Sequence, residues 1–424
     1  MRPIVFMAAC VLLTAPQESR GQGNPPPHAL PKPSENAGKR GTYQVKTTRA
    51  GCNYYVCVPA SYSETNPAGL HLFFHGQNGQ SGAPNFGTWS KHFLDKYNLI
   101  GINMQYEDGD NIKDTEGKVK AAQEAIAQTL ADYKIVAGRG VVCSFSGGGL
   151  PHALFYDGQA KNGRGAAWPF CHGALYSSNY RSKPAQQKLT PMSFFISVGQ
   201  GEWTLASLGA DGLARMTELQ GDTNQGAPSD LYFKVIKGKG HSIVDEEVAE
   251  SVNGFRRADL AFAPFVWAAD YAEKEFRAIV DDANNLVLGR AATGIDRLAE
   301  PLKAKGAKLR EKIDARVQAI LALVKELGET DPVLVGYYGP LFSRQVQGLP
   351  EAKELKELLS AAVKRPGHAK TLALVPMFQK NYRSFFDNGG MMNPVQAPFL
   401  EQVKATAGTG SQMGRMAADY LLLK

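Results

Sequence analysis

The stretch GVVCSFSGGG at residues 140–149 contains an apolar run, then a serine-rich turn, then the start of an apolar helical segment. Ser146 has small residues two positions before and after it, Ser144 and Gly148. A serine on a sharp strand-to-helix turn has a strained backbone, and bulky neighbours at those two positions would clash. The helix that follows also directs backbone N–H groups toward developing negative charge. The pattern predicts Ser146 as a nucleophile.

A second glycine-containing turn, His75-Gly76-Gln77, directly follows the apolar run HLFF at residues 71–74. An oxyanion needs a second N–H donor from a loop after an early strand, where a glycine lets the backbone approach the substrate. These residues also fit an ordinary glycine-rich turn with a structural His75. Together with the serine turn downstream, they predict that this loop carries the second donor.

The histidine that could serve as the base follows a late apolar run. GKGHS at residues 238–242 comes directly after LYFKVI, and a catalytic base must lie on a loop at the carboxyl edge of a sheet. Of the eight histidines, His241 alone both follows a late strand and lies after the serine turn and a candidate acid. His152 and His172, which are closer to the serine turn, are the alternatives.

The acid that would orient this histidine has three candidates. Glu202 ends the segment GQGE at residues 199–202, which follows the apolar run FFISV. A carboxylate there would orient His241 and stabilise its charged form. Asp211 and Asp222 lie in the same interval and compete for the role. Glu202 is favoured because it is closest to the end of the strand, where a loop residue is held most rigidly.

Around these motifs, apolar runs alternate with amphipathic stretches from about residue 42 to residue 245, as in β/α layered folds. Helices are expected at 115–133 and 205–219. Strands that are apolar throughout and separated by helices predict a mostly parallel sheet with helices on both faces. The expected strands are 54–59, 70–74, 99–104, 140–143, 194–198 and 231–236.

The pattern changes after about residue 250. A closing helix of the first domain is expected at 264–279. Apolar residues then recur at steps of three and four, which predicts one long amphipathic helix; they are Leu309, Ile313, Val317, Ile320, Val324 and Leu327. Further helices are expected at 351–364 and 396–422, with loops at 336–340 and 388–394. Residues 285–424 are therefore predicted to be a helical region, without a legible function or partner.

The first residues have the layout of a secretory signal: an early Arg2, a short apolar run ending near Leu13 and small residues after it. We therefore expect a signal peptide at 1–22, a Pro-rich linker at 23–41 and a secreted or periplasmic protein. Removing a signal that contains Cys10 leaves an even number of cysteines, which permits disulfides without specifying their pairing. The remaining cysteines are Cys52, Cys57, Cys143 and Cys171.

The overall composition excludes several other classes. The chain has 424 residues, of which 43% are hydrophobic and 21% charged, as in ordinary globular proteins. Its formal charge of +7 comes from basic residues interleaved with acidic ones, whereas nucleic-acid binders cluster them. Paired Cys and His residues at zinc-binding spacings are missing from the sequence. We expect no metal, no nucleic-acid partner and no stable membrane insertion.

Taken in order, HLFFHG, SFSGG, VGQGE and GKGHS resemble the motifs of the α/β-hydrolase superfamily. They are most similar to secreted esterases of the polyhydroxybutyrate-depolymerase and feruloyl-esterase kind, and YYVCVPASY at 54–62 is similar to an early strand of those enzymes. The resemblance covers roughly residues 42–275. It implies an α/β-hydrolase domain at 42–280, a triad of Ser146, Glu202 and His241, and an oxyanion hole formed by Gly147 and Gln77.

The same resemblance implies ester hydrolysis through an acyl-enzyme without a cofactor, on polysaccharide-linked or polyester substrates. The chain departs from the family pattern at two positions, with Ser144 in place of glycine and Glu202 in place of aspartate. Two alternatives share every motif: a serine peptidase or lactone hydrolase of the same fold, and a catalytically weak binding protein.

Overall fold

A computed structural model describes residues 30–49, 51–76, 86–106, 114–161, 170–178, 193–202, 230–387 and 394–423. The predicted signal peptide, the first part of the predicted linker, the expected helix at 205–219 and nearly all of the expected loop at 388–394 lie outside these residues. The same is true of three candidate site residues, Gln77, Asp211 and Asp222.

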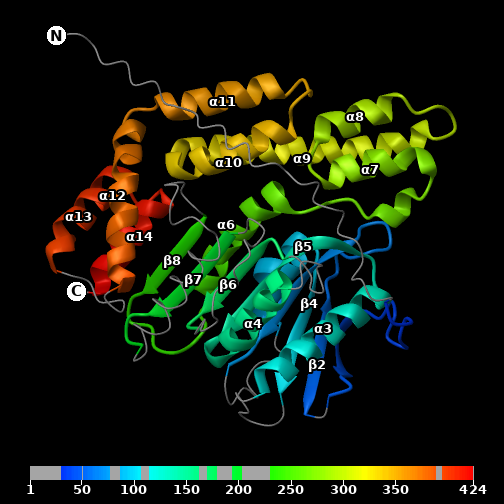
Figure 1. Cartoon of the computed structure of the whole chain (residues 1–424), viewed down its shortest axis with the longest axis horizontal. Coiled ribbons are helices and arrows are strands. Elements are labelled where there is room, and N and C mark those ends of the chain that lie inside the picture. Colours follow the sequence, from blue (N-terminus) through cyan, green and yellow to red (C-terminus); the bar gives the residue numbers. More distant parts are fainter. Residues whose placement is uncertain are drawn as a thin grey trace.

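The described residues form one eight-stranded sheet in the order β1-β2-β4-β3-β5-β6-β7-β8 (Figure 1). β2 is antiparallel to both of its neighbours, and every other neighbouring pair is parallel. The predicted mostly parallel sheet is confirmed, and this strand order is that of the α/β-hydrolase fold. The strands are β1 Gly41–Lys46, β2 Cys52–Val58, β3 Ala68–Phe74, β4 Leu99–Tyr106, β5 Ile135–Phe145, β6 His172–Tyr176, β7 Ser193–Gly199 and β8 Leu231–Ile236.

Helices cover both faces of this sheet. α3 (Thr115–Asp132) and α4 (Gly149–Lys161) pack on one face, while a short helical segment at Ser90–Leu94 and α6 (Asp245–Phe262) pack on the other (Figure 1). Every residue of β3 and β7 is buried, which explains why these strands are mostly apolar and do not alternate with exposed polar residues.

The expected closing helix at 264–279 is wrong. The helix in this part of the chain is α6, which ends at Phe262 because Ala263 precedes Pro264 and has an extended backbone, with ψ 135°. Two short 3₁₀ turns follow, and α7 begins only at Arg277. Strands β1 and β6 and helices α6 and α12 were not predicted.

The C-terminal region is helical, as predicted, and the long amphipathic helix is confirmed as α9. The expected loop at 336–340 is wrong, because these residues lie inside α10; Gly339 lets α10 approach Leu359, whose Cδ2 would lie 2.8 Å from an added Cβ. The expected helix at 396–422 is interrupted at Gly408, where φ is +68°. The helices are α7 Arg277–Asn284, α8 Leu288–Asp296, α9 Lys303–Thr330, α10 Pro332–Gln345, α11 Ala352–Lys364, α12 His368–Asp387, α13 Ala397–Ala407 and α14 Gln412–Tyr420.

These helices contribute to two hydrophobic cores. α7 to α11 surround a core of their own with the end of α6, whereas α12 to α14 add residues such as Phe378, Val403 and Tyr420 to the core of the sheet. α14 packs directly on β8 (Figure 1). The last helices of the chain are therefore part of the same packed unit as the sheet.

A buried polar cluster at the start of β8 joins the two parts. Arg257 of α6 donates two hydrogen bonds of 2.9 Å to the carboxylate of Asp230, which also accepts from Tyr338 of α10 and from Gln412 of α14. Burial alone would raise the pKa of Asp230, but the guanidinium of Arg257 holds it below its ordinary value. The cluster fixes the helical region to the sheet through an ionised carboxylate.

The four cysteines that the structure describes are buried free thiols. The possibility of disulfides among them is therefore not realised. Burial raises the pKa of Cys171 to about 12, so this thiol is not reactive at neutral pH. Among the described helices, none is long and apolar enough to cross a membrane.

The carboxyl of Asp419 on α14 gives a testable consequence of this packing. Its Oδ2 accepts a hydrogen bond of 3.3 Å from the N–H of Val235 in β8. Burial raises the pKa of Asp419 to about 7, although Lys234 partly opposes the shift. Because the folded pKa is above the unfolded value, the contribution of this carboxyl to stability is greatest at acid pH and is lost as the pH rises through about 7.

We expect Asp419→Asn to raise the thermal midpoint of unfolding at pH 8 more than at pH 5, because the amide can accept the same hydrogen bond without a buried charge. Differential scanning fluorimetry at both pH values measures the difference. An equal effect of the substitution at pH 5 and pH 8 would contradict the assignment.

Candidate active site

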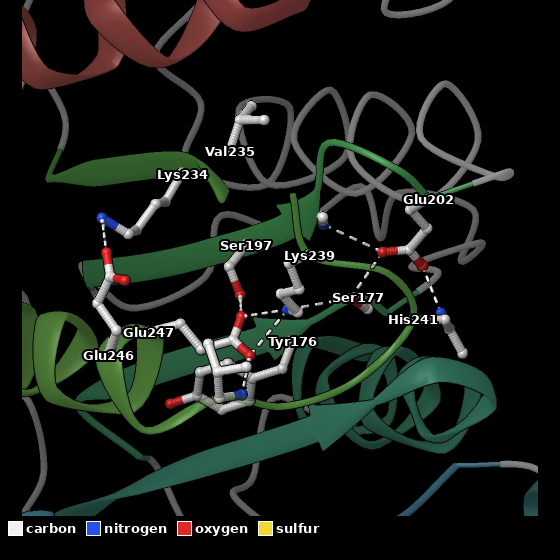
Figure 2. Close-up of polar contacts among 12 residues, drawn as sticks. Tyr176, Ser177, Ser197, Glu202, Lys234, Val235, Lys239, His241, Glu246 and Glu247 are labelled. Atoms are coloured by element: carbon white, nitrogen blue, oxygen red, sulfur yellow. Dashed lines mark hydrogen bonds and ion pairs between the residues drawn. The ribbon is translucent and has the colours of Figure 1, made fainter. Parts of the chain in front are cut away.

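Three of the predicted site residues meet at the carboxyl edge of the sheet. Ser146, Glu202 and His241 follow β5, β7 and β8, which are parallel and therefore end at the same edge. The Nε2 atom of His241 lies 2.7 Å from the Oγ atom of Ser146. Nδ1 of the same ring is hydrogen-bonded to Oε1 of Glu202, a contact that Figure 2 shows. The structure thus arranges a hydroxyl, an imidazole and a carboxylate in one hydrogen-bonded chain.

The backbone at Ser146 has the strained geometry that the sequence predicts. Its φ is +51°, a left-handed conformation that costs a non-glycine residue about 1–3 kcal/mol. A 3₁₀ turn at Ser146–Gly148 leads directly into α4, so Gly147 lies at the N-terminal end of the helical segment. A Cβ atom on Gly148 would lie 2.3 Å from the carbonyl oxygen of Phe74. The glycine is required because the turn packs directly on the end of β3.

Ser144 occupies the position where the family pattern has glycine, and the structure supplies a reason. Its Oγ lies 2.9 Å from Nδ1 of His152, which projects from α4 into the core. Burial lowers the pKa of His152 to about 3, so this ring is neutral at ordinary pH. His152 therefore pairs with Ser144 rather than serving as the base. The other alternative, His172, is also buried and pairs with Ser193.

His75 has a structural role in the turn after β3. Its Nε2 accepts a hydrogen bond of 3.1 Å from the N–H of Tyr106, so its protonated Nδ1 donates to the carbonyl of Gly76 at 2.6 Å. Burial lowers the pKa of His75, which keeps the ring neutral. Gly76 lies against the nucleophile turn, since an added Cβ would be 2.9 Å from Cβ of Ser146. The next residue is the predicted oxyanion donor Gln77, which lies outside the described residues.

Glu202 is buried, with 5% of its surface exposed, and its carboxylate is held by several donors. Oε2 accepts from Oγ of Ser177 at 2.7 Å and from the N–H of Gly199 at 3.2 Å, which leaves Oε1 for His241. Ser177 follows β6 and has a φ of +46°. Sequence reasoning missed Ser177, because β6 was not predicted and nothing local distinguishes this serine.

The loops that carry Glu202 and His241 are in backbone contact. The N–H of Gly201 donates to the carbonyl of Lys239 at 3.0 Å. A Cβ atom on Gly199 would lie 2.2 Å from the same oxygen, so glycine is needed there. This backbone contact helps to fix Glu202 and His241 relative to each other, independently of the hydrogen bond between their side chains.

The end of the chain also touches the acid loop. The amide nitrogen of Gln200 donates to the carbonyl of Leu422 at 2.9 Å, and its amide oxygen accepts from the N–H of Gly238 at 3.3 Å. Leu422 lies in a 3₁₀ turn, Leu421–Leu423, that follows α14. The C-terminal helices therefore contribute to the placement of both loops, a role that the sequence did not reveal.

The chemistry available here is nucleophilic. A hydroxyl bonded to an imidazole, whose other nitrogen is bonded to a buried carboxylate, can transfer its proton to the ring as it attacks an electrophilic carbon. Among the described residues, no group of three or more His, Cys, Asp or Glu side chains could hold a metal ion.

Neither family models nor curated protein sequences match the chain. Solved structures do: an acetyl xylan esterase from Aspergillus awamori is 15% identical, with 50% of this chain and 99% of that one covered and a TM-score of 0.38. Est1E from Butyrivibrio proteoclasticus is 12% identical, with coverage of 51% and 97% and a TM-score of 0.37. A putative dipeptidyl aminopeptidase IV from Bacteroides ovatus is 12% identical, with coverage of 50% and 35% and a TM-score of 0.37.

The position of Glu202 predicts a large effect of a single substitution. Glu202→Gln keeps the shape of the side chain but removes the charge that orients His241, so we expect turnover of an ester substrate to fall by about 10⁴. Steady-state kinetics at neutral pH measure the loss, with circular dichroism as the folding control. Asp245→Asn, at an exposed carboxylate, is the matched variant and should keep wild-type turnover.

The same kinetic assay tests the competing acids, Asp211 and Asp222. A folded, active Glu202→Gln protein beside an inactive Asp211→Asn or Asp222→Asn protein would transfer the role of the acid to the aspartate.

Proposed function

We propose that the protein is a serine carboxylic-ester hydrolase that works through an acyl-enzyme. The observation that supports this most directly is the 2.7 Å contact between Oγ of Ser146 and Nε2 of His241, made by a serine on a strained turn with φ +51°. A serine in an ordinary surface turn has no reason to adopt this backbone, to face a histidine backed by a buried carboxylate, or to precede a helix N-terminus.

In the first half of the reaction, Oγ of Ser146 attacks the carbonyl carbon of the ester, and its proton moves to Nε2 of His241. The carbonyl oxygen becomes an oxyanion, for which the N–H groups of Gly147 and Gln77 are the proposed donors. When the tetrahedral intermediate collapses, the bond to the alcohol oxygen breaks. The imidazolium of His241 gives its proton to that oxygen, so the alcohol leaves neutral and Ser146 carries the acyl group.

In the second half, water takes the place of the alcohol. His241 removes a proton from the water as it attacks the acyl carbon, and then returns the proton to Oγ of Ser146 as the acid leaves. Glu202 keeps Nδ1 of the ring protonated and stabilises the imidazolium formed in each half. No step of this proposed reaction requires a cofactor.

The sequence motifs support a substrate class for this proposal, and the first residues support a location. Their similarity to secreted polyester- and feruloyl-ester-cleaving enzymes favours an ester within, or attached to, a polymer. The signal-like first residues favour action outside the cytoplasm. The exposure of part of His241, whose side chain is 32% accessible, is compatible with a polymer that binds at the surface of the protein.

A substrate panel tests the proposal. It contains p-nitrophenyl esters of increasing acyl length, feruloyl and acetylated sugar esters, a lactone and a peptide anilide. We expect turnover of one or more esters, and Ser146→Ala should lower it by about 10⁶, because nucleophile and base act as a unit. Ser144→Ala should retain activity, although it loses the hydrogen bond to His152 and therefore some stability, typically about 1–3 kcal/mol.

Several results would contradict the proposal. Hydrolysis of the anilide or the lactone without any ester would select a peptidase or a lactonase. No turnover of the whole panel by folded protein would favour a binding protein. An inactive Ser144→Ala beside an active Ser146→Ala would move the nucleophile.

A further inference from the structure

A buried ion pair lies next to the proposed triad. Nζ of Lys239 is 2.8 and 2.7 Å from the two carboxylate oxygens of Glu247, and 3.4 Å from Oγ of Ser177. Ser177 in turn donates to Glu202, which bonds His241. Figure 2 shows these side chains in a row that runs from α6 to the base.

The donors and acceptors available in this row determine which group donates in each hydrogen bond. A lysine ammonium has three N–H donors and no acceptor, and here it has three acceptors: both oxygens of Glu247 and Oγ of Ser177. The hydroxyl of Ser177 has a single hydrogen. Because Lys239 donates to its oxygen, that hydrogen is directed to Oε2 of Glu202, and Oε1 is left to accept from His241.

The remaining contacts of Glu247 keep the pair rigid. Glu247 is fully buried in the first turn of α6, where Oε1 accepts from the N–H of Val244 at 2.7 Å and Oε2 accepts from Oγ of Ser197. The backbone of Lys239 is fixed as well, since its carbonyl accepts from Gly201 in the acid loop. The ammonium is therefore held in one place relative to Glu202.

Electrostatics explain why Lys239 is paired with a carboxylate. An unpaired ammonium near His241 would oppose the positive charge that the ring acquires when it takes a proton. The carboxylate of Glu247 neutralises Lys239, so Ser177 gains a strong donor without added net charge. Burial raises the pKa of Glu247 while Lys239 opposes the shift, as expected for a carboxylate whose ionised form depends on this cation.

Stability alone does not account for such a pair. Replacing both members of a buried ion pair by neutral groups of similar volume is often neutral or stabilising, because both charges had to be desolvated. This pair is connected to the proposed acid, Glu202, through Ser177, and that connection suggests a role in the reaction.

We propose that Lys239 and Glu247 are positioning residues: they fix the hydroxyl of Ser177, and through it the orientation of Glu202 and His241. This inference rests on the proposed esterase function. It predicts an effect on turnover rather than on substrate binding, because Lys239 contacts Ser177 and Glu247 and reaches the proposed triad through the carboxylate of Glu202.

The test uses a neutral pair of similar volume, Lys239→Met/Glu247→Gln, in the full-length protein. We expect kcat for the best ester of the panel to fall by about 10- to 100-fold, as is typical when a partner behind a functional side chain is lost, with little change in KM. The matched control is Lys234→Met/Glu246→Gln, which removes another lysine–glutamate pair made by α6, here with Lys234 of β8, that lies apart from Ser177 and Glu202 (Figure 2). The control should keep wild-type kcat.

A double-mutant cycle tests the route through Ser177. Ser177→Ala alone should lower kcat by a similar factor, and combining it with the Lys239/Glu247 variant should add little, because both changes break the same chain of hydrogen bonds. If Lys239→Met/Glu247→Gln fails to fold, Lys239→Met alone replaces it throughout, since Glu247 can then take up a proton.

Wild-type kcat in a folded Lys239/Glu247 variant would overturn the inference. So would a combined variant whose loss of kcat equals the product of the losses caused by the Lys239/Glu247 variant and by Ser177→Ala alone. An equal loss in the control pair would overturn it too, because breaking any lysine–glutamate pair at the start of α6 would then have the same effect. Wild-type protein without ester turnover would overturn the proposed function itself, and this inference with it.

Discussion

The left-handed backbone of Ser146 is the constraint on which the site depends. With a φ of +51°, this residue reverses the chain from β5 into α4 within a single turn and places its hydroxyl at the edge of the sheet, 2.7 Å from Nε2 of His241. The conformation is unfavourable in itself, and the packing around it over-determines it. Gly148 allows the turn to pack against the end of β3, and Gly76 allows the chain after β3 to pack against Ser146. The buried hydrogen bond between Ser144 and His152 holds the end of β5 against α4.

The acid and base are held by a second set of interactions that reaches far along the chain. Glu202 depends on Ser177, which follows β6, and the row continues through Lys239 to Glu247 on α6. Gln200 joins the same loops to the last residues of the chain. The C-terminal helices are thus connected to the site both through the core they share with the sheet and through one side chain beside Glu202.

The sequence was informative where local chemistry is distinctive. The residues around Ser146, Glu202 and His241 could be identified because each follows a buried apolar strand, and parallel strands end at one edge. β1 was missed because it is a mostly exposed edge strand of polar residues, and β6 because it is short and begins with His172 and Gly173. α6 carries a recognisable signal in its acidic first turn, starting at Asp245, which apolar spacing alone does not reveal. Ser177, Lys239 and Glu247 come from three separate elements, so only the fold shows that they meet.

Covalent labelling of the native protein by a fluorophosphonate is the sharpest test of whether Ser146 is a nucleophile, because the probe reacts only with a serine whose hydroxyl is activated by its neighbours. We expect a single phosphonylated residue, Ser146, identified by mass spectrometry of the digested protein. Labelling should be absent after heat denaturation and absent in Ser146→Ala. A folded protein that stays unlabelled, or one that carries the label on Ser144 or another serine, would contradict the account.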